Sequence, residues 1–138
     1  MNKWGGVKEM FRAGNEKMGN QMLTLPVAAG RILKENTIAV INNDGYAEPA
    51  TKSTGLKVIG RVQSPCDNTA GQNGDQQVSV KRGCFLWQQD GTIKNTDIMK
   101  KCYIKDPITV TLTEESSSPA GMIIGLEETY VIVDMTQA

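Results

Sequence analysis

The chain has 138 residues, with 15 basic and 15 acidic side chains, 14 glycines and no histidine. This length fits one domain, and the balanced charge argues against a dedicated nucleic-acid binder, which needs excess cations to neutralise phosphates. No stretch approaches the ~20 apolar residues of a membrane span, and the N-terminus lacks the apolar region of a signal peptide, so we expect synthesis in the cytoplasm and no membrane partner.

The first 21 residues differ from the rest of the chain. They are polar and glycine-rich, with isolated large apolar residues at Trp4, Val7, Met10, Phe11 and Met18. Because each glycine weakens a free helix by about 1 kcal/mol, we expect no independent fold here. The segment is predicted to be an arm, residues 1–21, that orders by laying these side chains on a partner, and residues 22–138 form a β-rich domain.

The next part of the chain reads as short strands between turns. Thr37–Ile41 and Tyr46–Ala50 flank the dipeptide Asp44-Gly45, which predicts a hairpin with a type I′ turn. The same kind of turn is expected at Asn73-Gly74 and at Asp90-Gly91.

Two longer strands follow the first hairpin. Leu56–Gln63 is predicted to be a strand that leads into the polar loop Ser64–Gly74. Val78–Trp87 is predicted to be one strand, with Val78 and Val80 facing inward.

The C-terminal part contains the clearest alternation. Ile108–Thr113 alternates apolar and polar residues, so we expect one buried and one wet face. After the loop Ser116–Pro119, Gly121–Gly125 and Thr129–Met135 are predicted to form a last hairpin.

Helical character is confined to two short segments, Ala29–Lys34 and Thr96–Lys101. Seven or eight short strands at this spacing predict a mainly β fold, as a small closed or nearly closed antiparallel barrel or sandwich.

The three cysteines, Cys66, Cys84 and Cys102, are spaced 18 residues apart and form no Cys-x-x-Cys pair. We interpret them as reduced, mostly buried thiols, with zinc binding and a structural disulfide as alternatives. No metal site and no cofactor are predicted.

Catalytic constellations are scarce. Without histidine there is no Ser-His or Cys-His pair, and Ser79 with Lys81 would be an exposed pair on one strand face. The adjacent carboxylates Glu127 and Glu128 lie in a predicted turn, where solvated charge is the ordinary explanation. Basic pairs near Trp87 and Tyr103 would allow weak single-strand binding, but a non-enzymatic protein without a nucleic-acid partner is expected.

Charge is unevenly distributed. Residues 1–31 hold five basic and two acidic side chains, whereas residues 106–138 hold six acidic and no basic ones. Such ends suit copies that meet head to tail, with contacts between Arg12 or Lys17 and Glu127 or Glu128; ordinary solvated charge is the alternative.

Across residues 23–134 an ordered series of motifs carries a resemblance. In chain order the motifs are Leu25–Gly30, Asn43–Ala50, Gly55–Val62, the loop Asp67–Asp75, Val78–Phe85, Tyr103–Asp106, Val110–Leu112, Ala120–Gly125 and Tyr130–Val133. This series resembles the capsid cement, or head decoration, proteins of tailed phages and prophages.

The resemblance implies a β-tulip-type decoration domain, a non-enzymatic role, and binding to the major capsid protein on the outer surface of the mature head. It also implies that the arm runs along neighbouring capsid subunits. Because self-association multiplies contacts on a lattice, we expect a homotrimer, or else a dimer. A tail or baseplate component and a small ligand-binding β-barrel are the alternative functions.

Overall fold

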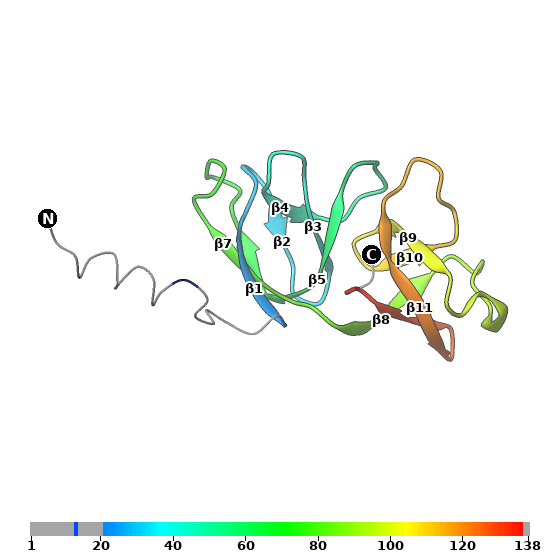
Figure 1. Ribbon diagram of the computed structural model, residues 1–138. Helices are drawn as coiled ribbons and strands as arrows, with labels where there is room; N and C mark the ends of the chain where they lie inside the picture. The colour runs from blue at the N-terminus through cyan, green and yellow to red at the C-terminus, as the bar shows by residue number, and fades with distance from the viewer. Residues whose placement is uncertain (1–12, 14–20, 137–138) are drawn as a thin grey trace, which may run out of the picture.

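The structure is a computed structural model and describes residue 13 and residues 21–136. Within them the prediction of a mainly β fold with antiparallel sheets is confirmed (Figure 1). The elements are β1 Met22–Pro26, β2 Ile32–Leu33, β3 Ile38–Ile41, β4 Ala47–Pro49, β5 Lys57–Ser64, β6 Cys66–Asp67, β7 Gln77–Lys81, β8 Cys84–Gln89, the 3-10 helix η1 Asn95–Asp97, β9 Lys101–Asp106, β10 Thr109–Thr111, β11 Pro119–Glu127 and β12 Tyr130–Asp134.

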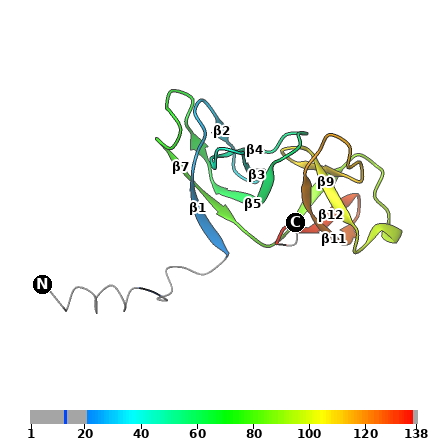
Figure 2. The same ribbon diagram turned by 45° about the horizontal axis from the view of Figure 1, so that its top comes forward.

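The strands form two units that lie side by side (Figures 1 and 2). The first is a five-stranded antiparallel sheet in the order β1-β7-β5-β3-β4, accompanied by the small β2-β6 pair. The second is a closed five-stranded barrel in the order β10-β8-β12-β11-β9, in which β10 and β8 run parallel and the other neighbours antiparallel. We call them the sheet unit and the barrel unit.

The chain passes between the two units at Arg82 and Gly83. The prediction of one strand over Val78–Trp87 is therefore wrong, because β7 pairs with β1 and β5 whereas β8 pairs with β12 and β10. Gly83 has a φ of +151°, a conformation that side chains rarely adopt, and it redirects the backbone between two sheets. The inward position of Val78 and Val80 is confirmed.

The first predicted hairpin is confirmed as β3–β4, but its turn is not type I′. Only Gly45 has a positive φ, +89°, and its N–H donates to the carbonyl of Asn42. The Asn42 side chain accepts from the N–H groups of Asp44 and Tyr46, at 3.0 and 3.1 Å. These bonds favour a three-residue loop closed by a left-handed glycine over the two-residue turn.

Neither of the two other predicted turns is a two-residue type I′ turn between paired strands, because Asn73 and Asp90 do not have a positive φ, so those predictions are wrong. Asn73-Gly74 lies in the long connection from β5 to β7, which contains β6. Asp90-Gly91 follows β8, which pairs with β12 and β10 but not with the next strand. The Asp90 carboxylate instead accepts from the hydroxyls of Thr92 and Thr111, at 2.6 and 2.7 Å.

The prediction that β10 has one wet face is also wrong. The alternation in Ile108–Thr113 predicts one wet face, yet Thr109, Val110 and Thr111 are all buried. β10 lies between β8 and β9 in the barrel, and the Thr111 hydroxyl stays satisfied through Asp90.

The helix predictions fare differently. Ala29–Lys34 is not helical but contains β2, whose pairing with β6 satisfies its backbone. Thr96–Lys101 is helical only where it overlaps η1, and the Asp97 carboxylate there accepts from the Lys94 N–H at 2.8 Å.

Each unit has its own core cluster, but the two cores interlock. Ile38 and Val40 belong to β3 of the sheet unit, yet they pack in the cluster of barrel residues around Trp87 and Ile104. The Ile38 N–H donates to the Pro107 carbonyl at 2.7 Å. Between β5 and β8, the Arg61 guanidinium stacks over the Phe85 ring at 4.7 Å, a cation–π contact. The units are therefore joined through side chains as well as through the chain.

Candidate interaction surface on the barrel

The predicted last hairpin is confirmed as β11–β12, and it contains a bulge. Ile123 pairs with Val133 and Gly125 with Ile132, so Ile124 is an extra residue between them. Ile123 and Val133 are fully buried, whereas Ile124 is exposed. Ile124 follows an inward residue and therefore faces outward, and the bulge places the next residue, Gly125, on the outside as well, opposite Ile132.

Neighbouring strands extend this apolar surface. Leu86 on β8 lies directly opposite Ile132, and Tyr130 lies two residues before Ile132 on the same face of β12. Met99, which is 65% exposed, donates its N–H to the Ile123 carbonyl and so lies beside β11. We call the set Leu86, Met99, Ile124, Tyr130 and Ile132 the outer barrel face.

The acidic pair predicted from the sequence lies at one end of this face. Glu127 ends β11, Glu128 follows in the turn to β12, and both side chains are exposed. Glu128 has a φ of +58°, an uncommon conformation for a residue other than glycine. The apolar surface thus has an acidic end, and a polar border of this kind is usual for a protein interface.

The other predicted site residues lie outside the described part of the chain. These are the basic residues Arg12 and Lys17 and the arm residues Trp4, Val7, Met10, Phe11 and Met18.

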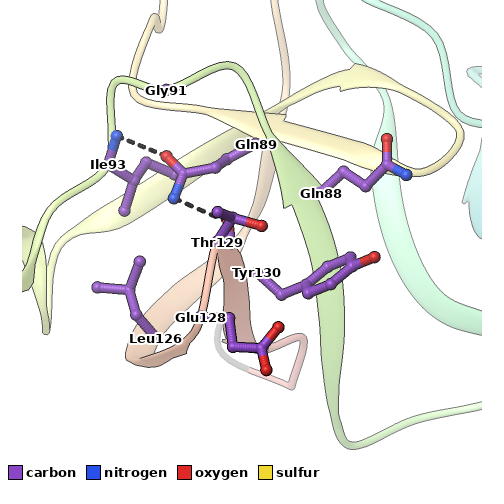
Figure 3. A pocket seen from close by; sticks show the side chains of 8 residues that line it. All are labelled: Gln88, Gln89, Gly91, Ile93, Leu126, Glu128, Thr129 and Tyr130. Atoms are coloured by element: carbon purple, nitrogen blue, oxygen red, sulfur yellow. Dashed lines mark hydrogen bonds between the residues drawn. The ribbon is translucent and has the colours of Figure 1, made fainter.

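A cleft of about 500 Å³ adjoins the acidic end (Figure 3). In Figure 3 the side chains of Gln88 and Tyr130 lie next to each other, and Glu128 lies beyond them at the turn. Gln89 is fixed: its Oε1 accepts from the Ile93 N–H at 2.8 Å, and its Nε2 donates to the Thr129 carbonyl at 3.1 Å. The cleft has no basic side chain in its lining, so it does not suit an anionic ligand.

A second apolar surface lies where the two units meet. A groove of about 470 Å³ is lined by Ile32, Pro49, Pro107 and Ile108, with Thr37, Lys34 and Asp106 at polar positions. Ile32 and Ile108 are exposed, and they come from different units. We call this the junction groove.

The cysteines do not form a site. All three are unpaired; Cys66 and Cys102 are buried and Cys84 is exposed. Burial raises the pKa of the Cys102 thiol to about 12, so it stays protonated at neutral pH. Among residues 21–136 no group of three or more Cys, Asp or Glu side chains is placed to hold a metal ion. In the same residues no helix is long and apolar enough to cross a membrane.

The structure also bears on the weak single-strand-binding interpretation. Trp87 is buried in the barrel core, where its indole N–H lies 3.3 Å from the Met135 sulfur and its ring packs edge-on against Phe85. It is therefore not available to stack on a base.

Sequence reasoning found Glu127 and Glu128 but missed the apolar residues beside them. A signal was present: Met122, Ile123 and Ile124 are three consecutive apolar residues in a strand of a small barrel. Successive residues in a strand point to opposite faces, so at least one of them had to face outward.

The comparisons with known proteins complete this description: no protein-family model, no curated protein and no solved structure matches the chain.

Proposed function

We propose that this protein is a structural virion protein that binds the outer surface of an assembled tailed-phage capsid and cements the head lattice. The observation that carries the proposal is the order of the motifs along residues 23–134. Most of these motifs lie wholly or largely on strands, among them Gly55–Val62, which forms β5 from Lys57 onward, Ala120–Gly125 on β11 and Tyr130–Val133 on β12.

The surface of the molecule supports such a role. It presents two separate apolar areas, the outer barrel face and the junction groove. A protein that touches neighbouring subunits of a lattice needs more than one contact surface, and linked contacts of modest strength add up to firm attachment. Because binding to the assembled lattice alone stabilises that lattice by RT ln(1 + [L]/Kd) per site, no catalytic group is required.

The finer features belong to the same proposal. The two units together form a β-tulip-type decoration domain, residues 1–21 act as an arm along capsid subunits, and three copies associate around a local symmetry axis. The partner is the major capsid protein, and the location is the outer capsid surface.

The test uses mature heads stripped of this protein, mixed with the full chain, with a chain lacking residues 2–20, or with an Ile108→Asn variant of the junction groove. We expect the full chain to sediment with the heads at saturating occupancy and to protect them from heat. The truncated chain is expected to bind far more weakly, because a large buried apolar side chain contributes about 1.5–3 kcal/mol and the arm carries several.

Two results would contradict the proposal. One is that the full chain does not bind mature heads at any concentration. The other is that the protein copurifies with tails in a few copies per virion, which would assign it to the tail or baseplate. Full occupancy by the truncated chain would instead show that the domain, and not the arm, carries the attachment surface.

A further inference from the structure

The outer barrel face is costly to leave in water. Leu86 is 44% exposed, Ile124 39% and Tyr130 42%, and they lie on three adjacent strands of one barrel wall. Contiguous exposed apolar side chains of this kind mark an interaction site on a soluble protein. The question is what covers the face before any partner binds.

The N-terminal segment reaches the domain close to this face. The Gln21 carbonyl accepts from the Arg82 N–H at 2.6 Å, and Met22 pairs with Lys81. Gly83 then leads directly into Cys84, the first residue of β8. Residues 1–20 therefore join the domain beside Arg82, which lies two residues before the start of β8, the strand that carries Leu86.

The length of the segment is sufficient. Twenty residues can span up to about 65 Å, whereas β11, the longest strand of the barrel, spans about 30 Å. A segment tethered this closely meets the face at an effective concentration in the millimolar range, which free partners do not reach.

The chemistry of the two surfaces matches. Residues 1–20 carry Lys3, Lys8, Arg12 and Lys17 against Glu9 and Glu16, an excess of positive charge, interleaved with two aromatic residues, Trp4 and Phe11. The face offers aliphatic side chains and the acidic end Glu127–Glu128. At its other end Lys101 lies opposite Met122, and Met122 lies opposite Asp134, so the charges there balance.

We propose that residues 1–20 dock on the outer barrel face of their own chain in the free protein. Trp4 and Phe11 pack against Leu86, Ile124 and Ile132, and the basic residues lie toward Glu127 and Glu128. A protein surface that binds the arm, such as a capsid subunit, has to displace it from this face. Binding of the arm therefore exposes the outer barrel face to a second contact.

The experiment measures acrylamide quenching of tryptophan fluorescence in the full-length free protein. Trp87 is buried in the barrel core, so Trp4 dominates the quenching. We expect Trp4 to be several-fold less accessible than in a synthetic peptide of residues 1–20. Leu86→Gln, and separately Glu127→Lys with Glu128→Lys, should raise the accessibility toward that of the peptide.

Each variant has a matched control. Ile32→Gln changes an aliphatic residue that is 43% exposed, almost as exposed as Leu86 at 44%, but lies in the junction groove. Glu114→Lys with Glu115→Lys reverses two exposed carboxylates in the loop before β11. Both controls should leave the accessibility of Trp4 unchanged.

Three results would overturn the inference. The first is that Trp4 is as accessible in the protein as in the peptide. The second is that Ile32→Gln exposes Trp4 as much as Leu86→Gln does. The third is that protection is lost on dilution, which would make a second copy the occupant. Because no capsid is present, these results are independent of the proposed attachment to heads.

Discussion

The sheet unit and the barrel unit differ in whether their outer strands are paired and in how many large apolar side chains they expose. The sheet unit is open, with β1 and β4 at its edges, and among its described residues its exposed large apolar side chains are only Met22 and Ile32. The barrel unit has no free edge and exposes six such side chains, from Leu86 to Tyr130. Closure satisfies the backbone of every strand, so an apolar outer wall does not also offer an edge for aggregation. The closed unit can therefore carry an apolar interaction surface that has no unpaired strand edge beside it.

The largest expected effect comes from the residue that belongs to both units. Ile38 lies on β3 of the sheet unit but packs fully buried in the barrel core. Ile38→Ala should lower the free energy of unfolding by about 2–5 kcal/mol, because it leaves a cavity. Far-UV circular dichroism and Trp87 fluorescence, measured in urea with Trp4→Phe, should still report one coincident transition.

The control for Ile38 is Val80→Ala, which removes a buried side chain from the other core cluster. It should also shift both probes together, by a smaller amount. If Trp87 kept its original midpoint in Val80→Ala while circular dichroism lost part of its amplitude, the two units would be independent rather than interlocked.

A second prediction concerns a polar anchor of the sheet unit alone. The Asn68 side chain is buried, and its Nδ2 donates to the carbonyls of Val27, Ala28 and Gln72. Asn68→Ala should cost about 1–3 kcal/mol, since it leaves buried acceptors without a donor. Chemical denaturation measures the loss.

Asn73 is the matched control in the same loop. Its Oδ1 accepts from the Ala29 N–H at 2.7 Å, but this bond is exposed to water. Asn73→Ala should change stability by about 0.5 kcal/mol or less. Equal effects at the two asparagines would mean that burial does not decide the strength of this anchor.

Thiol chemistry should separate an exposed cysteine from a buried one within the barrel unit. Cys84 is exposed, whereas Cys102 is buried with a pKa raised to about 12 by desolvation. An aromatic disulfide reagent at mildly alkaline pH should modify Cys84 in the native protein and Cys102 only after unfolding. Rapid modification that persists when both Cys66 and Cys84 are replaced by serine would show that the barrel opens readily.

The smallest expected effect on stability is the loss of the Asp97 hydrogen bonds at acidic pH. The Lys94 N–H and the Lys100 amine, at 2.8 and 3.1 Å, hold the pKa of Asp97 below its ordinary value of 3.8. The stabilisation is therefore present above pH 3.8 and is lost as the pH falls below that value toward the lower pKa of the folded protein. Asp97→Asn should flatten this part of the stability profile; a profile unchanged by the substitution would exclude Asp97 as its cause.

Much of the strand content could be predicted because its signals are local. The β3–β4 hairpin follows from the turn residues Asn42–Gly45, and β5 follows from the β-branched run near Val58. The β11–β12 hairpin was predictable for the same reason. Each of these elements is specified by residues that are neighbours in sequence.

The rest depends on partners far away in the chain. Nothing near Gly83 in the sequence reveals that Lys81 and Cys84 belong to different sheets. Thr111 is buried because β10 lies between β8 and β9 in the barrel, and its hydroxyl is satisfied there by Asp90, a contact over 21 positions. The outer barrel face was missed because Leu86, Ile124 and Ile132 come together only through the pairing of β12 with β8 and β11.

The barrel has an odd number of strands, and this requires the parallel pair β8–β10. Strand directions alternate around a ring of antiparallel neighbours, so such a ring needs an even number of strands. A ring of five must contain a parallel pair, and here β8–β10 is that pair, held at Thr109 with Gln88 and at Val110 with Gln89. This seam has two paired positions, fewer than any other seam of the ring. It is therefore the first place where the ring is expected to open.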